Sequence, residues 1–110
     1  MSVSENTGGT QSATVGTKHT LATITTAGTY QLLVEMDNMA DGDELEIRVE
    51  VKVRSGSSSK VLFSSTYKHA QGADAQVAMS LPVPAPFQII VTLKQTAGTG
   101  RSFVWSLYAY

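Results

Sequence analysis

Residues 44–54 alternate strictly between charged and aliphatic side chains. Side chains in a β-strand repeat every two residues, so the five aliphatic side chains of this stretch would share one face and the six charged ones the other. The aliphatic residues are Leu45, Ile47, Val49, Val51 and Val53. A helix would scatter both kinds around its circumference. The stretch therefore predicts a half-buried β-strand, whose charges of mixed sign face solvent or a polar partner.

Six other segments carry weaker strand patterns. They are residues 18–26, 29–37, 61–67, 75–81, 87–95 and 102–110. Turn-forming residues separate the segments at short intervals, and none of them has helical periodicity. The sequence therefore predicts an all-β fold of about seven strands, either an antiparallel β-sandwich or a jelly-roll-like domain.

A chain of 110 residues is long enough for one domain with one modest core. Residues 18–110 are predicted to form it, as a single β-sandwich domain. In residues 75–81 we expect Val77, Met79 and Leu81 to point inward. The core is expected to contain Leu32, Val34, Met36, Leu45, Ile47, Val49, Val51, Phe63, Val77, Ile89, Val91, Phe103, Trp105 and Leu107.

Residues 1–17 differ from the rest in composition, because serine, threonine, glycine, glutamine and asparagine dominate and neither periodicity is present. We expect a flexible N-terminal arm here. Two interpretations of the arm stay open. It is a frayed terminus, or it docks on a neighbouring subunit.

Two connections between the expected strands have specific backbone chemistry. Asp41 and Gly42 lie between segments 29–37 and 44–54, and an Asp-Gly pair is typical of tight turns because glycine reaches positive φ. These two segments are therefore predicted to form an antiparallel hairpin. The three prolines of residues 82–86 remove backbone donors and fix an extended path. This segment is predicted to be a stiff crossover between sheets and not a central strand.

Composition argues against several kinds of partner. The formal net charge is -1 with lysine and arginine dispersed along the chain, whereas nucleic-acid binding needs a basic patch. The chain has no cysteine, which excludes disulfides and thiolate zinc sites. No stretch approaches the roughly 20 apolar residues of a membrane span, and residues 1–17 lack the apolar run of a secretory signal. We expect no nucleic-acid partner and no membrane partner.

The titratable residues do not form a catalytic or metal-binding pattern. His19 and His69 are far apart and have no acidic partner at ligand spacing. The serines of residues 57–59 lie in an expected flexible turn, where a nucleophile cannot be held in place. We therefore expect a protein that is not an enzyme and that needs no cofactor and no metal.

One acidic cluster allows two interpretations. It consists of Asp37, Asn38, Asp41 and Asp43. Carboxylate oxygens on a tight loop are the ligands that calcium prefers, but the spacing does not match the EF-hand loop. Asp and Asn side chains also form hydrogen bonds within turns, and the sequence favours this turn chemistry.

Four apolar or aromatic side chains occupy positions where alternation predicts outward-facing residues. They are Ile90, Val104, Tyr108 and Tyr110. All four are candidates for a protein interface, where tyrosine in particular is enriched. Two alternatives stay open. Both faces of these strands are buried, or Tyr108 and Tyr110 stack on a sugar, as exposed aromatic rings of β-sandwiches often do.

The turn at residues 38–43, the strand at 44–54 and above all residues 82–105 form a recognisable set. Its most specific parts are the Leu-Lys-Gln-Thr block at 93–96 and the pattern Gly-x-Gly-Arg-x-Phe-x-Trp at 98–105. Through these features, residues 28–110 resemble small virion structural proteins of tailed bacteriophages, of the capsid decoration or cement type.

The resemblance implies a β-sandwich that self-associates, commonly as a homotrimer, on the outer capsid surface of a virion after synthesis in the host cytoplasm. The implied partner is the major capsid protein of a tailed phage, bound noncovalently across its subunits. The resemblance implies no catalytic residues. Another virion part, such as a tail or fibre protein, and a carbohydrate-binding β-sandwich module are the alternative functions.

Overall fold

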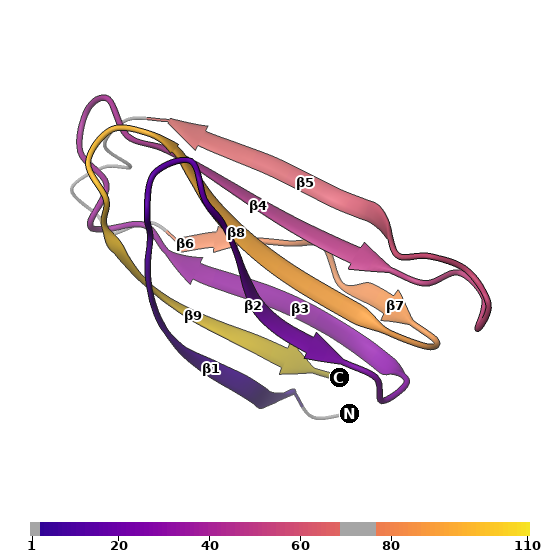
Figure 1. Ribbon diagram of the computed structural model, residues 1–110. Coiled ribbons are helices and arrows are strands. Elements are labelled where there is room, and N and C mark those ends of the chain that lie inside the picture. The colour runs from indigo at the N-terminus through magenta and orange to yellow at the C-terminus, as the bar shows by residue number, and fades with distance from the viewer. Residues whose placement is uncertain (1–2, 69–76) are drawn as a thin grey trace.

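The computed structural model describes residues 3–68 and 77–110. Within these ranges the chain forms nine β-strands and no helix (Figure 1). The strands are β1 (Ser4–Ser12), β2 (Lys18–Ile24), β3 (Gly28–Glu35), β4 (Glu44–Val51), β5 (Lys60–Lys68), β6 (Val77–Met79), β7 (Val83–Ala85), β8 (Ile89–Ala97) and β9 (Ser102–Ala109). They form two sheets, and every strand pairing is antiparallel. The predicted all-β antiparallel sandwich is confirmed.

The strand order is that of a jelly roll. Sheet A has the order β1-β9-β3, with β6 and β7 both pairing with β3, and sheet B has the order β2-β8-β4-β5. The pairs β1·β9, β2·β8, β3·β6 and β4·β5 show that the second half of the chain runs back along the first as one long ribbon. Each step along the ribbon passes from one sheet to the other, which wraps the ribbon into a roll.

The core lies between the two sheets, and β4 lines it as an interior strand of sheet B. β4 pairs with β8 on one side and β5 on the other, and its Leu45, Ile47 and Val49 are fully buried. On its outer face, Arg48 Nε lies 3.0 Å from Glu46 Oε1. Twelve of the fourteen expected core residues are buried, and of the other two, Phe63 is half-buried and Val77 is exposed.

The predicted hairpin of β3 with β4 is wrong. β3 belongs to sheet A and β4 to sheet B, so the connection between them crosses from one sheet to the other. Alternating patterns in two neighbouring segments are satisfied equally well by strands that pair and by strands that face each other across a core. The connection is longer than a tight hairpin needs, and its buried Met36 and Met39 pack against the core where the chain crosses.

The N-terminal segment also differs from the expected flexible arm. Residues 4–12 form β1, which pairs with β9 from Ser4 opposite Ala109 to Ser12 opposite Ser102. Most side chains of β1 are exposed. The strand is held at the sheet edge by backbone hydrogen bonds, so it needs no apolar alternation and leaves no periodic signal in the sequence.

β6 and β7 occupy the other edge of sheet A. In β6, Ala78 is buried and lies opposite Val34. Val77 and Met79 are exposed, and so is Leu81 beyond the strand, so the prediction that these three residues point inward is wrong. Three residues at an edge are too few for their apolar pattern to define the face. β7 takes up most of the proline segment and pairs with the start of β3 at the edge of sheet A, so the segment is not a central strand, as predicted. The expected crossover is wrong for these residues, because the chain passes to β8 in sheet B only after Ala85.

Candidate interaction surface

The outer face of sheet A carries an apolar patch. The patch, called the sheet A face below, consists of Leu33 of β3, Val77 and Met79 of β6, and Val104 and Tyr108 of β9. Val77, Met79 and Val104 are 50%, 54% and 44% exposed, respectively. Scattered apolar residues are normal on a protein surface, whereas a group of them on one face is a candidate interaction site.

Strand register makes the patch continuous. Leu33 lies opposite Ser106 on β9 and opposite Met79 on β6, and Tyr108 lies opposite Gln31 of β3. Leu33 and Met79 are therefore direct neighbours, with Cβ atoms about 5 Å apart, whereas Val104 and Tyr108 lie on either side of Ser106 and are diagonal neighbours of Leu33 at about 7–8 Å, so the patch extends across three strands. A shallow hollow of about 140 Å³ lies within it, lined by Leu33, Val77, Val104 and Tyr108 together with Glu35.

β1 brings a second carboxylate to this face. Gly8 lies opposite Ser106, and a Cβ at Gly8 would be 2.7 Å from Ser106 Oγ and 2.9 Å from Glu5 Oε2. The Ser106 hydroxyl donates a hydrogen bond to the Glu5 carboxylate. The absence of a side chain at Gly8 therefore lets Glu5 reach across to β9, and a negative charge lies on the β1 side of the patch.

Tyr110 follows β9 and is held by hydrogen bonds at one end of sheet A. Its amide donates to the carbonyl of Thr29 (3.0 Å), and its hydroxyl donates to the side-chain oxygen of Gln31. Gln31 Nε2 in turn donates to the carbonyl of Ser80 (2.9 Å), just beyond β6. Tyr110 is 42% exposed and contacts Gln31, the residue opposite Tyr108.

The structure brings three of the four predicted interface residues to one face and separates the fourth. Val104, Tyr108 and Tyr110 belong to the outward set of sheet A. Ile90 lies on the outer face of sheet B, between Thr23 of β2 and Glu50 of β4, and is half-buried there.

Sequence reasoning missed Leu33 and Met79 as members of the patch and assigned Val77 to the core. The signal for Leu33 was an apolar residue at an outward position of a strand that otherwise alternates well. The positions of Val77 and Met79 depend on the face of β6, which only its pairing with β3 determines.

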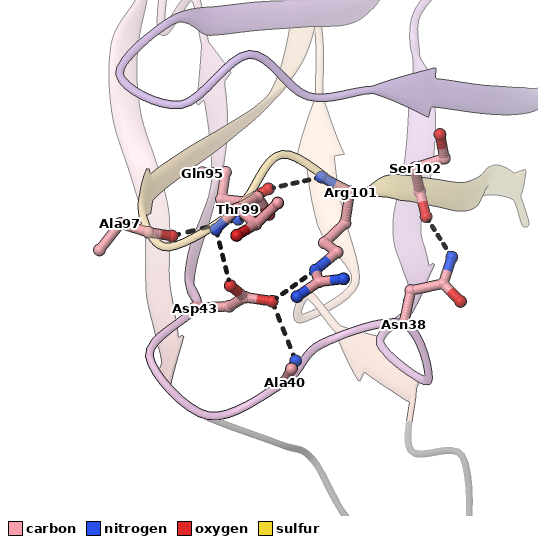
Figure 2. Close-up of polar contacts among 8 residues, drawn as sticks. All are labelled: Asn38, Ala40, Asp43, Gln95, Ala97, Thr99, Arg101 and Ser102. Atoms are coloured by element: carbon pink, nitrogen blue, oxygen red, sulfur yellow. Dashed lines mark hydrogen bonds and ion pairs between the residues drawn. The ribbon is translucent and has the colours of Figure 1, made fainter.

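Asp43 forms a second, polar centre at one end of the sandwich (Figure 2). Its side chain is 2% exposed and joins two connections. One carboxylate oxygen accepts hydrogen bonds from the amide of Ala40 (2.9 Å) and from Arg101 Nε (2.9 Å), and the other accepts one from the amide of Thr99 (3.0 Å). Asp43 therefore ties the β3–β4 connection to the β8–β9 connection.

The charge of Asp43 is stabilised where it is buried. Burial raises the pKa of the Asp43 carboxyl, but the amides of Ala40 and Thr99 and the guanidinium of Arg101 outweigh burial and hold that pKa below its ordinary value of 3.8. The carboxylate is thus ionised at neutral pH, with its oxygens directed at donors of the protein itself.

Buried Gln95 completes this centre. Its side-chain nitrogen donates to the carbonyls of Ala97 (3.1 Å) and Thr99 (2.6 Å), and its side-chain oxygen accepts from the amide of Arg101 (3.0 Å). Nearby, Asn38 Nδ2 donates to the carbonyl of Ser102 (2.6 Å). The bond from the amide of Ala40 to Asp43 lies within the turn, as the sequence favoured. Asn38 and the other donors to Asp43 instead join the turn to the β8–β9 connection, which the sequence did not predict.

The histidines considered as possible catalytic or metal-binding residues do not form a site in the described part of the chain. The ring nitrogens of His19 contact Gln11 Nε2 (3.2 Å) and the amide of Thr14 (3.1 Å), so this histidine supports the β1–β2 connection. His69 lies outside the described residues. Within residues 3–68 and 77–110, no three His, Cys, Asp or Glu side chains converge as metal ligands would. The same ranges contain no helix long and apolar enough to span a membrane.

Comparison with known protein families, with curated proteins and with solved structures found no match to this chain.

Proposed function

We propose that this chain is a non-enzymatic structural protein of a tailed-bacteriophage virion, a capsid decoration or cement protein. It self-associates and binds noncovalently across subunits of the major capsid protein on the outer surface of the head. The proposal takes the class of protein from the resemblance of residues 28–110 to such proteins. The jelly roll is compatible with it, since viral capsid domains use this fold, although lectins and cupins use it too.

The observation that carries the proposal is the sheet A face. Val77 and Met79 of β6 and Val104 of β9 are about half exposed on one face of sheet A, with Leu33 of β3 between the two strands, and an exposed apolar group of this kind is typical of an interaction site. Burial of such side chains against a partner is favourable by about 25 cal/mol for each Å² of apolar surface removed from water. The patch therefore supports a function that consists of protein–protein contact.

Carbohydrate binding is the second candidate, and the observation in its favour is that Tyr108 and Tyr110 share an outward face. Two features make it weaker. The hollow of about 140 Å³ is smaller than the roughly 300 Å³ at which ligand sites usually begin. In addition, the Tyr110 hydroxyl is already bonded to Gln31. A sugar would have to displace this contact or stack on the exposed part of the ring alone.

Co-sedimentation with phage heads that lack the protein tests the proposal. The wild-type chain should pellet with the heads and saturate at a fixed ratio to the major capsid protein. Val104→Asp places a charge in the patch, and its apparent affinity should fall by at least about tenfold, because a chain that no longer self-associates loses multivalent attachment. Ser64→Asp, at an exposed position on the outer face of sheet B, is the matched control and should bind like the wild type.

Circular dichroism of both variants would establish that they are folded. Wild-type chain that stays in the supernatant at every concentration would contradict head binding. Wild-type chain that ignores heads but is retained by a glycan column, and loses retention in Tyr108→Ala, would replace the proposal with the carbohydrate-binding function.

A further inference from the structure

The charges of the protein are divided unevenly between the two sheets. The strands of sheet A contain two charged residues, Glu5 and Glu35, and both are acidic. All eight lysines and arginines lie in sheet B or in the connections between strands. Glu35 lines the hollow, and Glu5 reaches towards it from β1. The sheet A face is therefore an apolar patch with acidic groups and no basic ones.

A surface with basic instead of acidic residues lies at the end of the β4–β5 hairpin. This hairpin end is defined here as Lys52, Val53, Arg54, Lys60, Val61 and Leu62. Val53, Val61 and Leu62 are 66%, 49% and 53% exposed. A bulge leaves Leu62 without a partner residue on β4, since Val49 lies opposite Phe63 and Glu50 lies opposite Val61. The hairpin end thus combines exposed apolar side chains with three basic ones.

The hairpin end is anchored to the body of the domain and is accessible. The amide of Lys52 donates to the carbonyl of Gln88 (3.3 Å), and the Ser59 hydroxyl donates to the Gln88 side chain (3.1 Å). Figure 1 shows the β4–β5 connection projecting at one end of the sandwich. Among the described residues, the ion pairs are Lys18–Glu50, Arg48–Glu46 and Arg101–Asp43, so neither the three basic residues of the hairpin end nor Glu5 and Glu35 take part in one.

We infer that the sheet A face of one copy binds the hairpin end of a second copy, head to tail. This inference rests on the proposed function, in which copies self-associate, and it names the two surfaces that meet. Val53 and Leu62 would cover Leu33, Val104 and their neighbours, while Arg54 and Lys60 approach Glu35 and Glu5.

Charge decides between this arrangement and a symmetric one. Two sheet A faces packed together would bring four carboxylates into one contact with no basic residue from either sheet A, and like charges in an interface act against association. A contact between two different surfaces leaves one of each free on every dimer. Such head-to-tail contacts close into a ring or continue as a filament.

Charge reversal tests the inference by light scattering, with the full-length chain. Glu35→Lys alone, and the pair Arg54→Glu with Lys60→Glu, should each raise the dissociation constant for self-association by at least about tenfold, because each places like charges opposite one another. Combining all three changes in one chain should restore the dissociation constant to within about threefold of the wild type. Lys94→Glu, on the outer face of sheet B away from both surfaces, is the control and should associate normally.

Mixing supplies a second readout that a symmetric contact would not give. The Glu35→Lys chain keeps a wild-type hairpin end, and the Arg54→Glu, Lys60→Glu chain keeps a wild-type sheet A face. An equimolar mixture should therefore associate where neither variant does alone. The inference would be overturned if both charge-reversal variants had the same mass as the wild type. It would also be overturned if neither mixing the two variants nor combining their changes in one chain restored association.

The result separates this inference from the proposed function. If the wild type self-associates and pellets with heads while the charge reversals change neither property, the head-to-tail contact is wrong and the decoration function stands. If the wild type neither associates nor pellets, the proposed function itself is contradicted.

Discussion

Replacing Asp43 with alanine is expected to lower the free energy of unfolding by about 3–5 kcal/mol, because it removes a buried carboxylate that accepts two backbone hydrogen bonds and an ion pair from the partly exposed Arg101. The carboxylate is almost fully buried and accepts hydrogen bonds from Ala40, Thr99 and Arg101. Alanine would leave two backbone donors and a guanidinium facing a small void. Chemical denaturation at neutral pH, followed by tryptophan fluorescence of Trp105, measures the loss.

Asp37→Ala is the matched control, because Asp37 lies on the same connection and is exposed. It should change the free energy of unfolding by no more than about 0.5 kcal/mol, as is usual for a surface substitution. A similar small effect for Asp43→Ala would contradict the structural role assigned to the buried carboxylate.

The same carboxylate should make stability depend on pH. Since the pKa of Asp43 is lower in the folded protein than the ordinary value of 3.8, its contribution is fully present above that value and is lost as pH falls through the lower folded pKa. Asp43→Asn removes this titration. The difference in unfolding free energy between wild type and Asp43→Asn should therefore be constant near neutral pH and shrink as the pH falls below about 4.

Gly98→Ala is expected to cost about 2–4 kcal/mol, the second large effect at this end of the molecule. Gly98 has a φ of 92°, which non-glycine residues avoid, and a Cβ there would lie 2.0 Å from Asp43 Oδ1 and 2.7 Å from Asp43 Cα. The methyl group would thus strain the backbone and displace the buried carboxylate from its donors. The measurement is again the denaturation midpoint and slope at neutral pH.

Gly16→Ala separates these two causes. Gly16 has a similar φ of 87°, but a Cβ there would meet nothing within 4 Å. It should therefore cost only the backbone strain, about 1–2 kcal/mol. Equal losses for Gly98→Ala and Gly16→Ala would show that contact with Asp43 adds nothing and would contradict the tight packing of the two connections.

The fold class could be predicted because burial imposes a period of two on several strands independently. β4 is the clearest case, since every inward residue from Leu45 to Val51 is aliphatic and every outward one is charged. Such a pattern defines which face is buried but not which strand lies alongside. This is why the segments of β3 and β4 were recognised as strands while their predicted hairpin was wrong.

The parts that could not be predicted depend on contacts distant in sequence. β1 pairs with β9, which is nearly the whole chain away in sequence. The pairing uses backbone N–H and C=O groups, and every residue except proline has both. Asp43 appeared as one of several turn residues, and its burial follows only from the approach of Thr99 and Arg101.

The candidate surface, too, could be predicted from the sequence only in part. Val104 and Tyr108 could be identified as outward residues from the alternation within β9 alone. Their grouping with Leu33, Val77 and Met79, and the separation of Ile90 onto the opposite sheet, follow from the order of strands in the roll. Alternation shows which side chains of a single strand face outward, whereas a surface patch depends on which strands are neighbours in the sheet.

The solution mass of the purified chain, measured by light scattering over a range of concentrations, tests most directly the claim that this protein works by associating with copies of itself. We predict a mass that rises with concentration to a multiple of the 11.7 kDa of one chain. The Val104→Asp variant should remain folded and stay at the mass of one chain. A wild-type mass of 11.7 kDa at every concentration would contradict the claim.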